Sequence, residues 1–520
     1  MSEINILWAD DEIEMLKPLQ IFLEKKGYRL HTVSNGYDAI DLLKENGKID
    51  VVFLDESMPG LSGLETLGQM KEFRSDIPVV MITKNEAESI MDEAIGSQIA
   101  DYLIKPVNPH QILLSLKKII DNKRLVGEKT SSDYQQEFRN LLMEINSGPG
   151  LTEWIEIYKK LVNWELKLEG SQFEQMMDIL AMQKKEANSE WSKFVSSNYL
   201  DWLDSSNQDA PVMSHNMMRK FVLPELEEGI PTVFVLMDNM RYDQWRIIEP
   251  ILKEKFYLEK ENHFLSILPT TTQYSRNAIF AGMMPDDIQK RFPEQWLNDN
   301  EDGGKNMYEE DFLKDQLSRL VKRDLKTTYI KVTRHHFGKQ LADKMTNFLD
   351  NDLTVIVYNF IDMLSHARTE MEVLKELAAD EAAYRSITRS WFLHSPLWAG
   401  LQKIADKKVR IIFTTDHGTI RVATPSRVVG DKDTTTNLRY KVGKNLRYQD
   451  SDVFDLRDPK AGGLPRPNIS STFIFAKEDR FFLYPNNYNH YHNYYQDTFQ
   501  HGGISLEEMI CPFGIFRSKV

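Results

Sequence analysis

The sequence predicts an α/β protein with two β-sheets separated by a helical segment. Three observations support this prediction. Residues 1–125 alternate apolar runs with amphipathic segments, residues 126–210 keep only helical periodicity, and residues 211–520 contain further apolar runs that end in acidic residues. Strands that alternate with helices are typical of parallel sheets covered by helices on both faces. Because 520 residues exceed what one hydrophobic core usually supports, we expect three domains with these boundaries.

Five apolar runs predict the strands of the first sheet. They comprise residues 4–9, 28–33, 49–54, 78–83 and 101–105. Short apolar runs of this length, bounded by polar residues, are typical of buried strands. The segments between them have the periodicity of amphipathic helices. We therefore expect a five-stranded parallel sheet in residues 1–125.

Polar residues close four of these runs. Asp10 and Asp11 follow the first run, Asp55 follows the third, Thr83 ends the fourth and Lys105 ends the fifth. The carboxyl ends of parallel strands meet at one edge of a sheet, where ligands bind. Neighbouring carboxylates repel one another, so an oxygen-rich pocket of this kind suits Mg²⁺. There Asp55 is expected to attack a phosphoryl donor, while Lys105 neutralises the developing charge and Thr83 hydrogen-bonds the phosphate.

This pattern resembles the receiver domain of response regulators, the flavodoxin-like fold of two-component signalling. The resemblance implies that a sensor histidine kinase phosphorylates Asp55. It implies that Asp11 binds Mg²⁺ directly and Asp10 through water, and that the rotamer of Tyr102 reports phosphorylation. Receivers commonly pair through their fourth and fifth helices, here near residues 84–98 and 109–123, so we expect a homodimer on phosphorylation.

Residues 126–210 are predicted to form a small helical bundle. Apolar residues recur at intervals of three and four in residues 134–145, 151–168, 173–185 and 190–203. Glycines and a proline in residues 146–150 and 169–171 indicate helix breaks. For the tryptophans of this segment we expect packing rather than a binding surface. No basic helix suited to reading DNA is evident.

Three apolar runs in residues 211–520 carry acidic and imidazole groups at their C-terminal ends. Residues 232–237 lead into Asp238, residues 353–361 lead into Asp362 and then His366, and residues 411–415 lead into Asp416 and His417. His501 precedes two glycines, and three threonines at 270–272 follow Pro269. These nitrogen and oxygen ligands match two four-coordinate zinc-type ions with open positions, an arrangement used for in-line phosphoryl transfer.

This region is similar to the PglZ domain, a branch of the alkaline phosphatase superfamily that includes nucleotide phosphodiesterases. The turn at residues 269–272, with a helix that ends at residues 281–285, looks like the nucleophile turn of that superfamily. Matched motif to motif, the resemblance places four residues around one Zn²⁺: Asp238, Thr272, Asp416 and His417. It places three around the second Zn²⁺: Asp362, His366 and His501.

A threonine hydroxyl needs activation to act as a nucleophile near neutral pH, and a bound cation provides it by lowering the hydroxyl pKa. Spacing from Pro269 and Gly282 favours Thr272 over Thr271, and both alternatives stay open. Attack on phosphorus would give a phosphothreonine that water then hydrolyses. Candidates for clamping a terminal phosphate are Arg241, Arg276 and Arg334, but the sequence places none of them.

Composition restricts the class of protein. The formal net charge of −14 disfavours bulk attraction to nucleic acid or anionic membranes, so any polyanion must bind locally. The single cysteine, Cys511, cannot form an intrachain disulfide, which leaves Asp, Glu and His as metal ligands. No apolar stretch reaches the roughly 18 residues of a membrane-spanning helix, and residues following Met1 lack the features of a signal peptide. We expect a cytoplasmic protein without membrane insertion.

The order of the three parts resembles PorX-type response regulators, which are associated with type IX secretion. That resemblance implies zinc-dependent phosphodiesterase activity on cyclic or linear oligonucleotides. The alternative is a phosphorylation-dependent binding module that docks transcription or secretion partners, such as a sigma factor or secretion components. Because no metal ligand is missing, the sequence favours catalysis. The preference for monoesters or diesters and the choice among Zn, Mn and Fe stay open.

Overall fold

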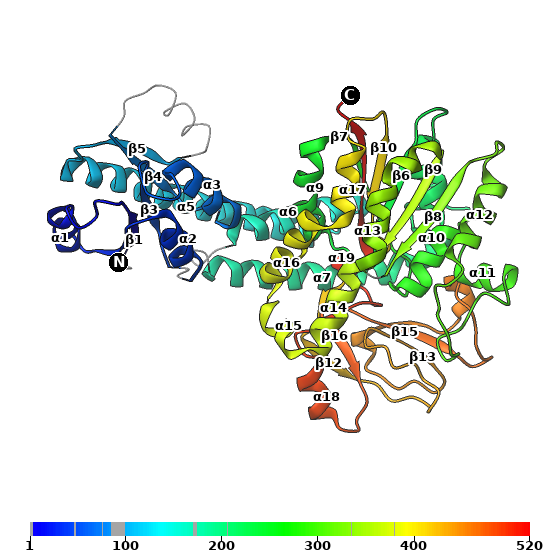
Figure 1. The fold of residues 1–520 in the computed structure, drawn as a ribbon. Coiled ribbons are helices and arrows are strands. Elements are labelled where there is room, and N and C mark those ends of the chain that lie inside the picture. Colours follow the sequence, from blue (N-terminus) through cyan, green and yellow to red (C-terminus); the bar gives the residue numbers. More distant parts are fainter. Residues whose placement is uncertain are drawn as a thin grey trace. The chain divides into compact units, whose positions relative to one another are not determined.

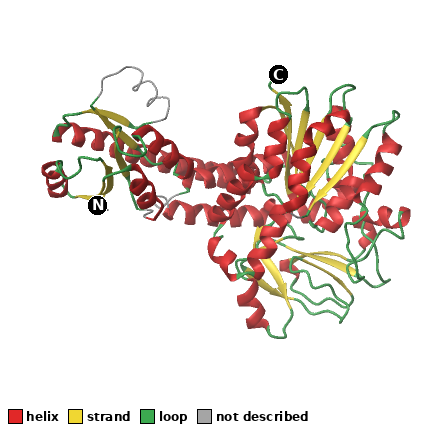
Figure 2. Cartoon of the chain, in the orientation of Figure 1, coloured by secondary structure: helices red, strands yellow, loops and turns green. Residues whose placement is uncertain are grey.

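The computed structural model describes residues 4–45, 48–74, 76–84, 99–169, 174–204, 206–333, 335–378 and 380–520. The chain forms two compact units, Met1–Asp133 and Tyr134–Val520. Each unit is built around a β-sheet with helices packed against it (Figures 1 and 2). No helix in the part of the chain that is described is long and apolar enough to cross a membrane.

The first unit contains the expected five-stranded parallel sheet, in the order β2-β1-β3-β4-β5. Its strands are β1 (Ile4–Ala9), β2 (Tyr28–Val33), β3 (Val51–Asp55), β4 (Val79–Thr83) and β5 (Asp101–Ile104). Its helices are α1 (Lys17–Lys25), α2 (Gly36–Glu45), α3 (Gly63–Phe73) and the start of α5 (Pro109–Asn146). Residues 85–98 lie outside the described residues, and with them the expected fourth helix.

Alternation along the first strand explains why both faces of this sheet are covered. Leu7 and Ala9 join one buried apolar cluster with residues of α2 and α3, whereas Ile6 and Trp8 join a second cluster with residues of α1 and α5. Successive side chains of a strand point to opposite faces, so one strand contributes to both cores. This is the three-layer arrangement that the sequence predicted.

The helical segment differs in its breaks from the prediction. It consists of the remainder of α5, α6 (Leu151–Leu168) and α7 (Glu174–Leu203). The separation expected between residues 173–185 and 190–203 was wrong, because residues 186–189 contain no Gly or Pro and continue one helix. Residues 109–123 and 134–145, expected as separate helices, also belong to one helix, which continues through Gly127. Trp154 and Trp191 are buried with ring centroids 5.7 Å apart, consistent with packing.

The second unit contains a six-stranded sheet in the order β7-β18-β10-β6-β9-β8. Its strands are β6 (Thr232–Met237), β7 (Phe256–Leu265), β8 (Thr327–Val332), β9 (Leu353–Tyr358), β10 (Arg410–Thr414) and β18 (Ile510–Ser518). The four strands from β10 to β8 are mutually parallel, whereas β18 runs antiparallel to both of its neighbours, β10 and β7. Every residue of β6, β9 and β10 is buried, as expected of central strands.

Helices cover both faces of this sheet (Figure 2). In the β6–β10 register Phe234 lies opposite Ile412, so the next residue, Phe413, points to the other face. Phe234 contacts Phe280 of α10 (Asn277–Ala281), whereas Phe413 contacts Trp245 of α9 (Tyr242–Lys255). The two sets of helices therefore enclose the strands between them.

Further elements surround this core. The helices are α8 (Ser214–Met217), α11 (Pro285–Arg291), α12 (Glu309–Leu320), α13 (His335–Lys344), α14 (Phe360–Glu370), α15 (Glu372–Leu377), α16 (Glu381–His394), α17 (Pro396–Lys403), α18 (Tyr488–Tyr495) and α19 (Leu506–Met509). The strands of three small sheets are β11 (Ile420–Arg421), β12 (Thr424–Arg427), β13 (Tyr440–Gly443), β14 (Val453–Leu456), β15 (Thr472–Ala476), β16 (Arg480–Leu483) and β17 (Phe499–Gln500). One pairing brings two histidine segments together: β11 follows His417, β17 precedes His501, and the two strands pair antiparallel.

Candidate functional site

The first candidate site lies at the carboxyl ends of the strands in the N-terminal unit. Lys105 Nζ lies 2.9 Å from Asp10 Oδ2 and 3.1 Å from Asp55 Oδ2, and both carboxylates are buried. Oxygens of Asp10, Asp11 and Asp55 lie within 4.8 Å of one another, with Asp11 exposed. Three carboxylates therefore face one lysine, and the remaining negative charge suits a hard divalent cation such as Mg²⁺.

Electrostatics at Asp55 agree with this interpretation. Burial, followed by the negative charge of Asp10, raises the pKa of Asp55 to about 6 despite the nearby Lys105. Asp55 Oδ1 is buried and has no hydrogen-bond partner in the described part of the chain. Thr83 is buried at the end of β4, and Tyr102 on β5 is half-buried. The phosphorylation of Asp55 and the switch roles of Thr83 and Tyr102 stay predictions.

The second candidate site lies at the carboxyl ends of β6, β9 and β10. The ligand atoms of Asp238, Asp416 and His417 lie within 4.8 Å of one another, and all three residues are fully buried. Those of Asp362, His366 and His501 form a second group of the same size. The rings of His417 and His501 are 4.6 Å apart, so the two groups adjoin. The structure therefore brings together every side chain that the sequence predicted for this site.

The sheet register and the loops explain this convergence. Met237 lies opposite Tyr358, so Asp238 and the start of α14, which carries Asp362 and His366, leave neighbouring strands at one level. Asp416 and His417 follow β10 on the other side of β6. The pairing of β11 with β17 then holds the His501 segment against the chain that follows His417.

Thr272 is the threonine that faces this site. It begins a π-helical turn, Thr272–Arg276, and its Oγ1 lies 3.2 Å from both Asp238 Oδ1 and His417 Nε2. Thr271 Oγ1 is buried without a hydrogen-bond partner among the residues described. Thr270 Oγ1 instead donates to the carbonyl of Gly503 and accepts from the amide of Gly502, which ties the turn to the His501 segment. This geometry favours Thr272 over Thr271 as the nucleophile.

Burial sets the protonation of the ligand groups. It raises the pKa values of Asp362 and Asp416 to about 6, and the charge of Asp238 adds to both shifts. Burial opposes ionisation of Asp238 as well, but the guanidinium of Arg276 outweighs it and holds the pKa of Asp238 below the usual range. Burial also holds the pKa of His501 well below its usual value. Near pH 7 the site therefore presents carboxylates and a neutral imidazole, the forms that bind metals.

A buried acceptor of this site lacks a hydrogen-bond partner among the described residues. His417 Nδ1 donates to the carbonyl of Gly418 at 3.0 Å, so its Nε2 directs a lone pair toward the carboxylates of Asp238 and Asp416. Within the described ranges, Asp416 Oδ2 is buried with no hydrogen-bond partner, and His501 Nε2 lies 3.9 Å from Asp362 Oδ1. Unpaired buried polar atoms are costly, and a cation would satisfy them. The donor set fits Zn²⁺ or a similar ion.

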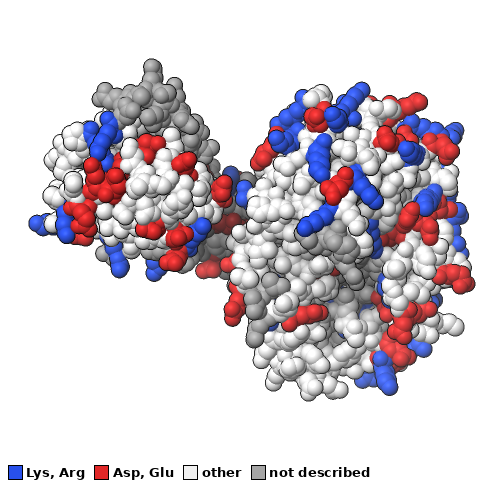
Figure 3. All heavy atoms as spheres, in the orientation of Figure 1, with Lys and Arg blue, Asp and Glu red and all other residues white. Residues whose placement is uncertain are grey.

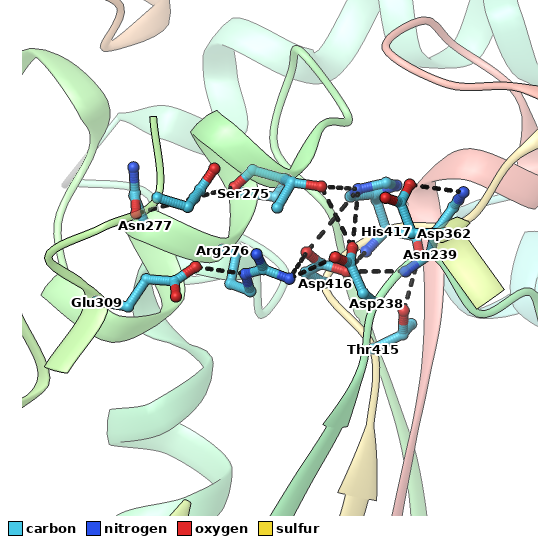
Figure 4. Close-up of polar contacts among 12 residues, drawn as sticks. Asp238, Asn239, Ser275, Arg276, Asn277, Glu309, Asp362, Thr415, Asp416 and His417 are labelled. Carbon is cyan, nitrogen blue, oxygen red and sulfur yellow. Dashed lines mark hydrogen bonds and ion pairs between the residues drawn. The ribbon is translucent and has the colours of Figure 1, made fainter. Parts of the chain in front are cut away.

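Arg276 is a residue of this site whose contacts sequence reasoning did not predict. Its Nη1 lies 2.6 Å from Asp238 Oδ2, and its Nε lies 2.5 Å from Glu309 Oε1 (Figure 4). Lys331 Nζ and Tyr329 Oη hold the other oxygen of Glu309 at 2.7 and 2.6 Å. Arg276 thus places a fixed positive charge beside Asp238 Oδ2, while Asp238 Oδ1 faces Thr272. Its spacing of four residues from Thr272, one helical turn, was the available signal.

The other arginine candidates are placed differently. Arg241 is buried and donates from its Nε to Asp243 Oδ1 at 2.9 Å, so it is committed to a carboxylate of its own helix region. Arg334 lies outside the described residues.

Asn239 is a further residue of the site that the sequence analysis did not predict. Its backbone N–H donates to Asp416 Oδ1 at 3.2 Å, and its side-chain Nδ2 lies 3.5 Å from Asp362 Oδ1. Asn239 therefore contacts both groups of candidate ligands. It adopts a left-handed φ of 65°, which asparagine tolerates.

Comparison with known proteins was made over the whole chain. A family model described as "Response regulator receiver domain" matches residues 6–117, and one described as "PorX response regulator linker domain" matches residues 124–203. The model described as "BREX system PglZ alkaline phosphatase-like domain" matches residues 217–514, more than half of the chain. These three matches follow one another without overlap.

Individual relatives match only part of this chain. The transcriptional regulatory protein ZraR of Klebsiella oxytoca is 34% identical over 124 residues, which are 24% of this chain and 28% of that protein. The CpxR homolog of Haemophilus influenzae is 28% identical over 166 residues, 32% of this chain and 70% of that protein. A receiver domain structure from Clostridium thermocellum is 29% identical, with a TM-score of 0.23, and covers 24% of this chain and 98% of that one.

The matches and the folds agree. The first unit has the five-stranded parallel sheet of a receiver, and the second has helices on both faces of a sheet whose strand ends carry Asp and His. A response regulator receiver is thereby joined to a domain of the alkaline phosphatase-like hydrolases. The chain belongs to the PglZ alkaline phosphatase-like family and has the domain order of a PorX-type response regulator.

Proposed function

We propose that this response regulator has a metal-dependent phosphodiesterase as its output, with Thr272 as the nucleophile and cyclic or linear oligonucleotides as substrates. One observation carries the proposal. Two adjoining groups of Asp and His ligands lie beside a threonine hydroxyl at the carboxyl ends of three neighbouring strands. Ligand groups paired in this way are typical of enzymes that stabilise both the attacking and the departing oxygen of a displacement at phosphorus.

The residues of the site have separable roles. Asp238, Asp416 and His417 would hold one Zn²⁺, and Asp362, His366 and His501 the other; bound Zn²⁺ supplies Lewis acidity and lowers the pKa of oxygen ligands. Asp238 Oδ1 lies where it can accept the proton of Thr272. Arg276 keeps Asp238 ionised and therefore able to accept it. The threonine oxygen then bonds to phosphorus, the ester bond to the leaving oxygen breaks, and that oxygen takes a proton from water.

A second displacement completes the cycle. Water attacks the phosphothreonine, its oxygen bonds to phosphorus, and the Thr272 oxygen leaves and regains a proton. Substrates are expected to bind locally. On the face shown in Figure 3, basic and acidic side chains are interspersed over the C-terminal unit, and the net charge is −14. Broad electrostatic attraction of long nucleic acids is therefore not favoured, which supports short oligonucleotides.

Control by phosphorylation is part of the proposal. A sensor histidine kinase would phosphorylate Asp55 with Mg²⁺ held by Asp10, Asp11 and Asp55, and phosphorylation would promote a homodimer. We further propose a cytoplasmic role in regulating type IX secretion. The family match to the PorX linker domain supports this role.

The test compares two neighbouring threonines. In purified full-length protein with Zn²⁺, Thr272→Val is expected to lower turnover of bis(p-nitrophenyl) phosphate at least about 100-fold, as loss of a nucleophile does, with zinc content unchanged. Thr271→Val is the matched control, because Thr271 Oγ1 has no hydrogen-bond partner within the described segments, and should retain turnover. Full turnover by Thr272→Val, or loss confined to Thr271→Val, would remove the assigned nucleophile.

A further inference from the structure

We propose that helix α7 of the linker positions both halves of the catalytic site, through Tyr199 and Asn188. The proposal rests on the proposed phosphodiesterase function and names residues outside the ligand set. Each side chain bonds the backbone of a segment that carries catalytic residues. Both are positioning residues, since neither lies in the ligand groups.

Tyr199 holds the segment that leads into the nucleophile turn. Its side chain is fully buried, and its hydroxyl oxygen accepts a hydrogen bond of 2.8 Å from the amide of Leu268. Leu268 precedes Pro269, and Thr272 follows four residues after Leu268. The two preceding amides, of Ser266 and Ile267, donate to Met509 O and Ser214 Oγ within the catalytic domain. The hydrogen bond that Tyr199 accepts from Leu268 is therefore the linker's contribution to holding this segment.

Asn188 holds the segment that follows the ligand His501. Its Oδ1 accepts from the amide of Leu506 at 2.9 Å, and its Nδ2 donates to Glu507 Oε2 at 3.0 Å. Both residues belong to the short helix α19. Asn188 is 5% exposed, so these bonds are shielded from water and expensive to lose. A single linker side chain thus fixes the start of α19.

Helix α19 in turn fixes the backbone beside two histidine ligands. Glu508 Oε1 accepts from the amide of Gly503, two residues after His501. The carbonyl of Glu508 accepts from the amide of Gly418, the residue after His417, at 3.1 Å. The approach is close: a Cβ added to Gly418 would lie 2.0 Å from Glu507 O. A displacement of α19 would therefore move both histidine segments.

Helical geometry places the two contacts on one rigid face. Asn188 and Tyr199 are separated by 11 residues, about three turns or roughly 16 Å of helix. Trp191 and Val195 are buried on nearly the same side, and Ser192 Oγ accepts from the amide of Glu478 at 3.3 Å. A shift of α7 would disturb the nucleophile turn and the histidine segments together.

Paired substitutions within the linker test this proposal. Tyr199→Phe removes one hydroxyl, and its control is Tyr134→Phe, which removes a hydroxyl equally buried that bonds Gln183 inside the linker. Asn188→Leu removes two hydrogen bonds, and its control is Gln183→Met, on the same helix, which loses its bonds to Tyr134 and to Phe138 O. All four are made in the full-length chain.

The expected results separate the two contacts. Tyr199→Phe should lower kcat for bis(p-nitrophenyl) phosphate about fivefold to tenfold at unchanged zinc affinity, the effect of one hydrogen bond expressed in the transition state. Asn188→Leu should weaken zinc binding about tenfold, measured against a competing chelator. Both controls should keep wild-type values. Equal losses in test and control variants, or none in the test variants, would overturn the proposal.

A readout that needs no turnover keeps this inference separate from the proposed function. Amide hydrogen exchange of residues 264–272 should quicken in Tyr199→Phe and that of residues 500–509 in Asn188→Leu, with neither changed in the controls. If the wild type does not hydrolyse phosphodiesters, the proposed function fails while exchange and zinc affinity still decide on α7. Unchanged exchange in both test variants would refute it.

Discussion

Arg276→Met tests the electrostatic account of the site most sharply. The guanidinium is buried and lies 2.6 Å from Asp238 Oδ2 and 2.5 Å from Glu309 Oε1. Methionine approximates the volume of the side chain but leaves two buried carboxylates without this partner. Breaking a buried ion pair by removing one member costs about 3–5 kcal/mol. Because Lys331 and Tyr329 still bond Glu309, we expect a value near the lower end, about 3 kcal/mol.

The measurement is urea unfolding followed by tryptophan fluorescence in zinc-free buffer. Eight of the nine tryptophans lie in the C-terminal unit, so the signal reports that unit. Arg291→Met is the matched control: Arg291 also forms a bidentate pair, with Asp315, but on the surface, where water screens the charges. The control should change the unfolding midpoint much less. Arg276→Met losing no more stability than the control would refute the reasoning.

Three further predictions concern other parts of the two candidate sites. Asp55→Asn should stabilise the Mg²⁺-free N-terminal unit near pH 7. The pKa of Asp55 in the folded protein is about 6, above that of an unfolded aspartate, so wild-type stability falls as pH rises from about 4 to 6. The stability gain of the variant should therefore vanish below pH 4 in thermal melts that resolve this unit. Chelation of bound metal should lower the melting temperature of the C-terminal unit. Adding Zn²⁺ at about 1,000 times its Kd should restore about 4 kcal/mol of unfolding free energy. An unchanged melting temperature would contradict the account. Arg439→Met should weaken zinc binding about tenfold in chelator competition. The buried Arg439 forms an ion pair with Glu508, and Glu508 accepts hydrogen bonds from the amides of Gly503 and Gly418, next to the two histidine segments. Unaltered zinc affinity would exclude that role.

Local sequence patterns predicted most of the fold and the side chains that converge at the candidate site. Apolar runs of strand length marked both sheets, and residues at their C-terminal ends, such as Asp238 and Asp416, met because parallel strands end at one edge. The single course of α7 was missed because two amphipathic stretches were treated as separate helices. The absence of Gly and Pro in residues 186–189 was the available signal for one continuous helix.

Contacts between distant segments were not predictable in this way. Glu309 lies 33 residues from Arg276, and nothing in its local pattern indicates that it holds that guanidinium. Tyr199 and Leu268 are 69 residues apart, and Asn188 and Glu507 are 319 apart. Such pairs are specified by the packing of complete elements rather than by periodicity. The residues that orient the ligands therefore emerge only from the three-dimensional arrangement.

The central claim is that distant acidic and imidazole side chains form two adjoining cation sites beside Thr272. Elemental analysis of the purified protein tests it most directly, after loading with excess Zn²⁺ and removal of unbound metal by dialysis. The account predicts about two equivalents of zinc per chain by the ligand count, one lost in Asp416→Asn and the other in Asp362→Asn. Wild-type protein without bound zinc, or variants that both retain two equivalents, would contradict it.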